Sequence, residues 1–318
     1  MPPWTYLCPI LVSLREREDI WGDKEIHVVG GVYRGVGGQS KQQYSKEIRM
    51  DILTHTLSGT AIGTVVSSFA NSGVKNRLKI ILISGFAGAL PDLDVISLWS
   101  GFDSTIGDFF NLSVSGKDIY SAKYWYSHHA FMHSAFAGIF IAGFLGLVSY
   151  FIDSKFKELK NKSFVGSLNQ KRILLIGFLL GFFIHLIEDM PTPASTWGGV
   201  DFFWPSKSYI GGTGDIWWWN NYDIFLIVIG VIIINLILHL IQRFVHFDLR
   251  KFTVGVFIIG FSFGIIQIKT RDFDFAYTGK TTRYQEFETR SKQLQKEILG
   301  DKIYRMMENF DNKLKIYF

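Results

Sequence analysis

The sequence contains a single cysteine, Cys8. One cysteine excludes an intramolecular disulfide framework, and it also excludes a metal cage built from several thiolates. Cys8 stands too isolated to be a catalytic nucleophile, and no triad of serine, histidine and aspartate is apparent. Any metal ion bound by this chain would therefore be held by nitrogen and oxygen atoms.

Charge is scarce in several long stretches of the chain. With 48% hydrophobic and 16% aromatic residues among 318, the sequence is too apolar for an ordinary soluble domain. The near-uncharged runs predict an all-α, multi-pass membrane protein. We expect about six transmembrane helices, at residues 52–70, 80–99, 130–152, 173–187, 224–241 and 252–268. The fourth run is short and reaches span length only if Glu188 and Asp189 are tolerated near its end, which requires partners for them.

Lysine and arginine alternate between the loops that join these runs. The loops after the first, third and fifth runs carry twelve basic residues, and those after the second and fourth carry only Lys117, Lys123 and Lys207. Because basic loops stay in the cytoplasm, the first run begins outside. These loops account for most of the net charge of +5, so we expect no nucleic-acid partner. The run of tryptophans at 217–219 fits an interfacial aromatic belt on the outer side.

Four polar motifs fall at the outer end of this arrangement. They are LTHT around His55, LPDLD ending at Asp94, HHAFMHS starting at His128, and HLIEDMPTP starting at His185. Ionisable side chains at membrane depth cost at least a few kcal/mol each, so a cluster of them indicates a functional site. We expect a metal centre at the extracytoplasmic end of a protein of the cytoplasmic (inner) membrane.

His185 and Asp189 are the strongest local signal. Residues four apart on a helix share one face at a distance of roughly 6 Å, so both side chains can bind one ion. Pro191 and Pro193 end the helix directly afterwards. The alternative is a histidine that is hydrogen-bonded to a carboxylate inside a bundle. Gly177, in the same run, would allow close approach of a neighbouring helix, as would Gly181.

The other candidate ligands have structural alternatives of their own. On a helix that starts the third run, His129 and His133 would share a face, whereas His128 and His133 would not. Three histidines in six residues exceed what a polar helix cap needs. The residues Asp92 and Asp94 follow Pro91 and would stand on a turn, where simple capping is the alternative. His55 alone would more often be structural.

The two ends of the chain differ from its centre. Residues 1–49 are polar and lack strong periodicity, so we expect an unstructured extension or an artefact of the gene model, with translation starting at Met50. Residues 50–268 would form the membrane-embedded domain. Residues 269–318 mix basic, acidic and apolar side chains, and we expect an amphipathic tail that forms a pair of helices near the membrane surface.

The ordered set MDILTHTLSG, LPDLD, HHAFMHS, HLIEDMPTP and FFWP resembles the LexA-binding, inner-membrane-associated hydrolases, also called membrane-bound metal-dependent hydrolases. The resemblance covers roughly residues 50–209. It implies a polar site composed of His55, Asp92, Asp94, His128, His133, His185 and Asp189. Where the family commonly has H-R-G-x-T-H, this chain has His129 in place of the arginine, and the resemblance leaves open whether His129 takes over its role.

Together these patterns predict a membrane-bound hydrolase that uses metal-activated water on an ester or phosphoester of an amphiphilic or lipid substrate. One or two divalent ions would be bound, with zinc favoured by the histidines and manganese or magnesium by the aspartates. The general base or other catalytic group would be among Asp92, Asp94, Glu188 and His129. A non-catalytic membrane adaptor with a structural metal is one alternative. An ion transporter is another, although its site is expected near the midplane.

Overall fold

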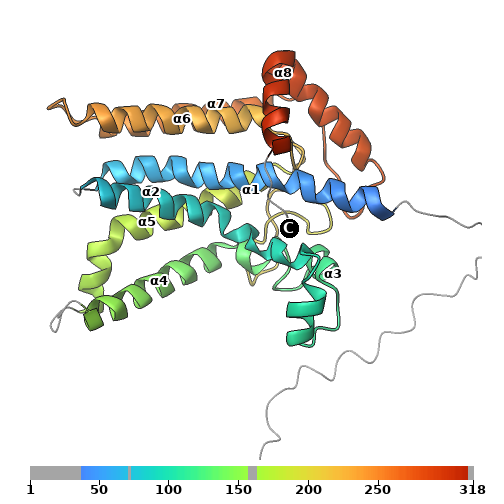
Figure 1. The fold of residues 1–318 in the computed structure, drawn as a ribbon, viewed down its shortest axis with the longest axis horizontal. Helices are drawn as coiled ribbons and strands as arrows, with labels where there is room; N and C mark the ends of the chain where they lie inside the picture. Colours follow the sequence, from blue (N-terminus) through green and yellow to red (C-terminus); the bar gives the residue numbers. More distant parts are fainter. Residues whose placement is uncertain (1–36, 71–72, 157–162, 314–318) are drawn as a thin grey trace, which may run out of the picture. The chain divides into compact units, whose positions relative to one another are not determined.

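The computed structural model describes residues 37–70, 73–156 and 163–313 of the chain, drawn in colour in Figure 1. The chain divides into two units, Met1–Ser40 and Lys41–Phe318, and the second holds all the described helices except the first turn of α1. In the described residues all regular structure is helical, which confirms the all-α prediction. The bounds are α1 Gly37–Ser68, α2 Val74–Ala89, η1 Pro91–Leu98, η2 Asp103–Gly107, α3 Gly116–Ser121, η3 Phe131–His133, α4 Ala135–Phe156, α5 Phe164–Asp189, α6 Tyr222–Ile241, α7 Arg250–Lys269 and α8 Tyr284–Lys313.

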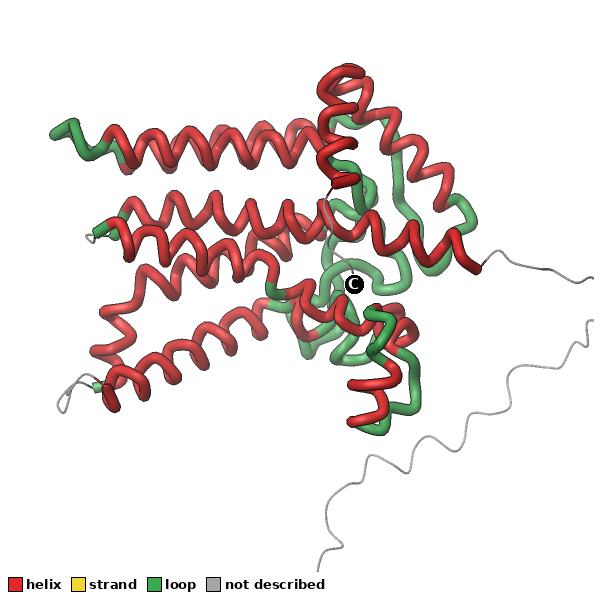
Figure 2. The backbone as a smooth tube through the Cα atoms, in the orientation of Figure 1, coloured by secondary structure: helices red, strands yellow, loops and turns green. Residues whose placement is uncertain are grey.

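The long helices of the second unit run side by side, and the longer loops gather at one of their ends. Figure 2 shows these loops at the end where α8 lies. There two isolated bridges, Pro193 with Thr213 and Val200 with Ile210, fold the segment between α5 and α6 onto itself, and a third, Ser195 with Thr278, joins it to the segment between α7 and α8. Polar motifs that end their helices at this side are therefore brought into one region.

Small residues let α1, α2 and α5 approach closely. A Cβ atom built on Gly59 of α1 would lie 2.3 Å from the carbonyl oxygen of Ser84 on α2. One built on Gly181 of α5 would lie 2.3 Å from the same oxygen. Ser84 is thus held between both neighbours, a packing mode common among membrane helices. The close approach expected at Gly181 is confirmed.

Among the residues that the structure describes, three helices are long and apolar enough to cross a membrane: α4 over Ala135–Ile152, α6 and α7. A fourth crossing exists if α2 and η1 form one broken span, since they bend by 49° at Leu90, directly before Pro91. Proline at the start of η1 cannot continue the hydrogen bonding of α2, which explains the break. The chain is therefore a membrane protein with three or four supported spans.

The third predicted span begins later than the sequence suggested. Residues 128–134 form turns and the short 3-10 helix η3, and α4 starts only at Ala135. The hydroxyl oxygen of Ser134 accepts a hydrogen bond from the backbone N–H of Ala137 at 3.1 Å, as an N-cap residue does. The helical argument for His129 and His133 is therefore wrong.

Two further expectations need correction. Trp217 and Trp218 are buried in a cluster with Phe275 and Phe287, so they form a protein core and not an interfacial belt.

In the N-terminal region, α1 extends back to Gly37, into the residues that were expected to be unstructured. Residues 1–36 lie outside the described residues. The expected C-terminal helix pair corresponds to α8, which kinks at Gly300, where φ is 73°.

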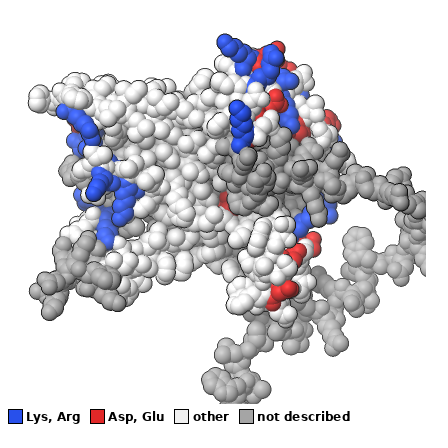
Figure 3. Space-filling model, in the orientation of Figure 1, with Lys and Arg blue, Asp and Glu red and all other residues white. Residues whose placement is uncertain are grey.

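Basic side chains gather at the end of the bundle opposite the loops. In the view of Figure 3, lysines and arginines form a patch there, whereas α8 carries both signs of charge. This end holds the last residues of α1, α4 and α6 and the first turns of α2, α5 and α7, with Lys75, Lys171 and Arg243 among the basic residues nearby. The charge asymmetry expected from the loops is thus present between the two ends of the bundle.

Candidate metal centre

Eight side chains from four segments converge at the loop end of the bundle, and we name them the His/Asp cluster. They come from α1, η1, the turn before α4 and the end of α5. The members are His55, Asp92, Asp94, His128, His129, His133, His185 and Asp189. All are buried except Asp94, which is partly buried. Burial of so many ionisable groups is costly unless they are paired or bind an ion.

His185 and Asp189 form the centre of the cluster. On α5 their side chains share one face, with Nε2 of His185 3.1 Å from Oδ2 of Asp189. Nε2 of His133 is 3.5 Å from the same Asp189 oxygen and 3.5 Å from Oδ1 of Asp92. Nε2 of His185 also lies 3.6 Å from that Asp92 oxygen. Two carboxylates and two imidazoles thus face one small volume.

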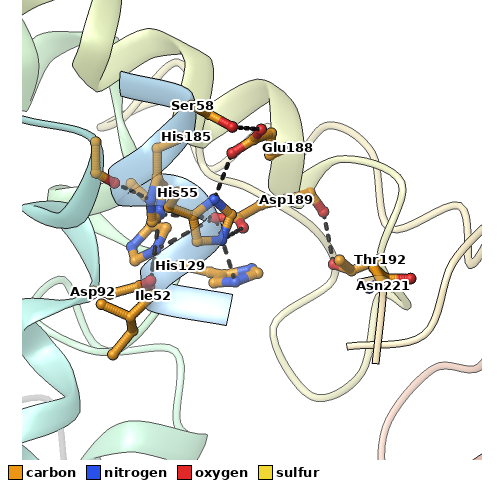
Figure 4. A network of polar contacts seen from close by, with 12 residues as sticks. Ile52, His55, Ser58, Asp92, His129, His185, Glu188, Asp189, Thr192 and Asn221 are labelled. Carbon is orange, nitrogen blue, oxygen red and sulfur yellow. Dashed lines mark hydrogen bonds and ion pairs between the residues drawn. The ribbon is translucent and has the colours of Figure 1, made fainter. Parts of the chain in front are cut away.

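The remaining histidines surround this centre. Figure 4 shows the ring of His55 between Glu188 and Asp189, and its Nε2 is 3.3 Å from Oδ1 of Asp189. Nε2 of His129 is 3.9 Å from Oδ2 of Asp189. Nδ1 of His128 lies 2.9 Å from Oδ1 of Asp94. The histidines predicted from separate motifs are therefore neighbours in space.

Four of the five imidazoles have Nδ1 held by an acceptor. Nδ1–H of His185 donates to the carbonyl of Gly88 at 2.7 Å, and that of His129 donates to the carbonyl of Gly199 at 3.1 Å. The other two donate to carboxylates: Nδ1–H of His55 to Glu188 at 2.8 Å and Nδ1–H of His128 to Asp94. These bonds assign the proton to Nδ1 and make Nε2 the acceptor atom in a neutral ring. Metal-binding histidines are held in the same way.

Several atoms of the cluster are buried without a hydrogen-bond partner in the described structure. They are Nε2 of His185, both ring nitrogens of His133, Oδ2 of Asp189 and Oδ2 of Asp94. Native proteins rarely leave such atoms unsatisfied, and a bound ion can satisfy them. Since the unsatisfied atoms are imidazole nitrogens and carboxylate oxygens that face each other, they fit a divalent cation.

The donor atoms form more than one candidate ligand set. Each set offers ligand atoms that lie within 4.8 Å of one another. The sets are His128 with His129 and His133; His55 with Asp92 and His185; His133 with His185 and Asp189; and Asp92 with Asp94 and His128. Two sets without a shared residue, such as the last two, have room for two ions.

The histidines before α4 differ in their protonation. Burial, together with the neighbouring His128 and His133 rings, lowers the pKa of His129 well below its usual value. Burial likewise lowers the pKa of His133, by more than the neighbouring carboxylates raise it. At His128 burial acts in the same direction, but the carboxylates of Asp94, Asp92 and Asp189, with Asp94 contributing most, together outweigh it and raise the pKa. His129 and His133 are therefore neutral near neutral pH, the form that binds a metal.

His129 has an unusual backbone. Its φ of 62° lies in the left-handed region, which residues other than glycine seldom adopt. The ring is held between Nδ1–H donation to Gly199 and a contact with Trp197, whose ring centroid is 4.9 Å away. Residues kept in such conformations often occur at functional sites. The turn, and not a helix face, brings His129 towards Asp189.

The structure therefore brings together all the residues predicted for the site, and it adds several that were not predicted for it. Ser58 donates a hydrogen bond to Glu188, and Tyr120 stacks on His128 with 4.5 Å between the ring centroids. Trp197 and Trp218 belong to a small cavity, about 80 Å³, that Asp92, His128, His129 and Asp189 also line. Only the position of Ser58, three residues after His55 on α1, could have been suspected from helical spacing.

Comparisons with known proteins give one result. No curated protein and no solved structure matched the chain. The family model of the YdjM inner membrane protein matched residues 50–273, so it includes all four polar motifs and begins at the first of them. A match over this length supports membrane localisation, and the chain belongs to the YdjM inner membrane protein family.

Proposed function

We propose that the protein is a membrane-bound metal-dependent hydrolase that acts on an ester or phosphoester of an amphiphilic or lipid substrate. The observation that carries the proposal is the set of buried, unpartnered donor atoms on His133, His185 and Asp189, which face one another at 3.1 to 3.5 Å. A cluster that serves only packing would satisfy these atoms with each other or with backbone groups.

Divalent ions would be held by seven side chains of the His/Asp cluster, with His129 as an additional donor nearby. Zinc is favoured because five of the eight groups are imidazoles, and manganese or magnesium remains an option because three are carboxylates. The ligand sets His133–His185–Asp189 and Asp92–Asp94–His128 support two ions. When bound, such an ion lowers the pKa of a coordinated water and polarises the substrate oxygen.

The chain's own groups suggest distinct proton and positioning roles. Glu188 accepts hydrogen bonds from His55 and Ser58, so we assign it to the orientation of His55 more than to proton abstraction. Asp94 orients His128 through Oδ1 and keeps Oδ2 unpartnered, which leaves one oxygen that could accept a proton. His129 lacks a hydrogen at Nε2 when its Nδ1–H donates to Gly199, so it fits an acceptor or ligand role better than that of an arginine substitute.

We further propose six spans, with the His/Asp cluster at the extracytoplasmic side. Helices α1 and α5 would be the two spans beyond those supported by length and composition, since both pack tightly against α2. Reporter fusions test this orientation. A fusion after Lys162 should be cytoplasmic, and one near Lys117 should be extracytoplasmic. Both reporters on the same side would reject it.

A non-catalytic adaptor with a structural metal is the second candidate, because the same unpartnered atoms would fit a structural ion. Metal analysis of the purified protein combined with a hydrolysis screen separates the two. We expect His185→Ala to lose bound metal, and His239→Ala, whose Nε2 lies 2.8 Å from the Thr64 carbonyl oxygen on α1, to retain it. A catalytic site predicts that Asp189→Asn abolishes ester or phosphoester hydrolysis while the protein still folds. Strong unfolding of Asp189→Asn, with no turnover by wild type in the presence of zinc, manganese or magnesium, would favour the adaptor.

A further inference from the structure

A large apolar groove runs along the bundle between two pairs of helices. Its volume is about 490 Å³, and its walls come mainly from α5 on one side and from α6 and α7 on the other. Ser58 and Ala61 of α1 complete it. The lining consists largely of isoleucine, valine and phenylalanine side chains, with Ile187, Ile227 and Ile268 among them. A volume in the range of about 300–1,000 Å³ is typical of cavities that bind small molecules.

One end of this groove reaches the His/Asp cluster through Glu188. Glu188 lines the groove, and its Oε2 accepts the hydrogen bond from Nδ1–H of His55. The opposite nitrogen of His55 is 3.3 Å from Asp189. A smaller cavity of about 50 Å³ is also lined by His55 and Glu188, together with Ile224 and Ile268, which the groove shares. The groove and the candidate metal centre therefore have a common wall.

The polar groups of the groove are few: Ser58, Glu188, Thr213, Asp215 and Lys269. Glu188 and Lys269 stand at the ends of α5 and α7 that lie at the loop end of the bundle. Lys269 and Asp215 form an exposed ion pair at 2.7 Å, and Thr213 donates a hydrogen bond to Asp215. The rest of the surface offers dispersion contacts only. Since α6 and α7 are both apolar enough to span a membrane, the groove lies at the depth of lipid chains. A long hydrocarbon chain matches this surface, whereas a polar metabolite does not.

We propose that the groove holds one acyl or similar hydrocarbon chain of a lipid substrate, and that the polar bond to be cleaved lies beside Glu188 at the His/Asp cluster. This rests on the proposed function and narrows its substrate class to lipids with a long chain. Moving a chain from the bilayer into an apolar groove gives little hydrophobic gain, since lipid tails are as apolar as the groove. The groove would therefore act by orienting the substrate, as substrate-positioning surfaces do.

Gly264 offers a way to fill the groove. It lines the groove from α7, and a Cβ atom built on it would meet no described atom within 4 Å. The Cβ of a phenylalanine at this position would therefore lie in open space beside the groove, so its ring can enter the groove. Gly255 is a matched control, because it lies on the same helix, does not line the groove, and a Cβ there would also meet no described atom within 4 Å.

Photo-crosslinking in lipid nanodiscs tests occupancy without any assumption about catalysis. The probe is a phosphatidylcholine with a diazirine in the middle of one acyl chain, present as a minor component of dioleoyl lipid. We expect peptides that contain Ile227, Val228 and Val231 to be labelled in the wild type. Labelling should fall several-fold in Gly264→Phe and stay at the wild-type level in Gly255→Phe. Equal labelling of these peptides in all three proteins would overturn the proposal.

Rates of hydrolysis provide a second test of the groove. With two substrates that share the scissile bond, Gly264→Phe should reduce turnover of the long-chain lipid by about tenfold and leave a short-chain, water-soluble analogue unchanged, because only the remote binding contacts are lost. Equal loss on both substrates would count against the groove. If the wild type cleaves neither substrate but the crosslinking difference persists, the groove still binds a lipid chain and the proposed hydrolase function fails.

Discussion

Two buried polar clusters lie at the loop end of the bundle, and their polar atoms are satisfied in different ways. One is the His/Asp cluster. The other, which we name the Arg271 network, consists of Arg271, Asp223, Asn221 and Gln295 and joins α6, the end of α7 and α8. In this network the guanidinium of Arg271 donates to both oxygens of Asp223, at 2.9 and 3.0 Å. It also donates to Asn221 at 2.8 Å.

The amide of Gln295 closes this network. It donates to Asp223 at 2.9 Å and accepts a hydrogen bond from the Asp223 backbone N–H at 3.0 Å. Of the side-chain atoms in the Arg271 network, Nε of Arg271 is the one that is buried and unpartnered in the described structure. The His/Asp cluster has such atoms on His133, His185, Asp94 and Asp189.

The presence or absence of hydrogen-bond partners for the buried polar atoms distinguishes a structural cluster from a ligand-binding one. A satisfied network of opposite charges can fix one arrangement of helices without a ligand. A cluster whose buried nitrogen and oxygen atoms face each other without hydrogen bonds requires a bound ligand. In the His/Asp cluster these atoms are imidazole nitrogens and carboxylate oxygens, which fit a cation. Burial and charge alone would not distinguish the two clusters, because both are almost fully enclosed.

The largest expected change in stability comes from removing Arg271 from the Arg271 network. Arg271→Ala should lower the free energy of unfolding by about 3–5 kcal/mol, because Asp223 would remain buried without its cation. Chemical denaturation in detergent measures this change. Arg283→Ala serves as the control, since Arg283 pairs with Glu286 on the surface and its removal should have little effect. A similar small effect in both variants would show that the Arg271 network is not structural.

Metal addition should act only on the unsatisfied cluster. If an ion binds the folded protein, metal-free protein should gain about 2.7 kcal/mol of unfolding free energy when free zinc reaches a hundredfold excess over its dissociation constant. The gain should be absent in His185→Ala and should persist in Arg271→Ala if that variant folds. Thermal unfolding with and without a chelator gives the measurement. An equal gain in His185→Ala would mean that zinc binds elsewhere.

A smaller effect is expected from the groups that orient the cluster. Glu188→Gln preserves the size of the side chain but removes the charge that faces Nδ1 of His55. Loss of such an outer partner typically weakens metal affinity by about 10–100-fold. Competition with a chromophoric chelator measures the affinity, and Glu297→Gln, the same exchange at an exposed position on α8, is the control. Unchanged affinity in Glu188→Gln would argue that His55 is not a ligand.

The convergence of the cluster could be predicted because its residues lie in short sequence motifs, and all the motifs fall at the same end of the predicted spans. His185 and Asp189 are four residues apart, and the 3.1 Å contact follows from helical geometry. Charge alternation in the loops placed the other motifs at the same end. The sequence could not give the conformation of residues 128–134, because a left-handed residue such as His129 is fixed by Gly199 and Trp197, which lie far away in the chain.

Tertiary packing also decides features that the sequence misassigned. Trp217 has the composition and position of a membrane belt, but its Nε1–H donates to Glu288 of α8 at 2.8 Å, so it is enclosed by protein. That partner is 71 residues away, and no local pattern connects the two. In the same way the closeness of α1 and α5 depends on Ser84 of α2, a contact that glycine spacing can suggest but not assign to a partner.

The smallest expected effect uses the same substitution in both clusters and should differ in sign. In metal-free protein at alkaline pH, where the imidazoles are neutral, Oδ2 of Asp189 faces the Nε2 lone pair of His185 at 3.1 Å and lies 3.5 Å from Nε2 of His133. An asparagine amide at position 189 could donate to one of these nitrogens, so Asp189→Asn should stabilise the metal-free protein by about 1 kcal/mol. Asp223→Asn should instead destabilise it, because Arg271 loses its counter-charge. At acid pH the imidazolium rings need the Asp189 carboxylate, and the gain from Asp189→Asn should reverse. Chemical denaturation of both variants at the two pH values measures these changes in unfolding free energy. Destabilisation by Asp189→Asn at alkaline pH would mean that the polar atoms of the His/Asp cluster are paired without a metal, as those of the Arg271 network are.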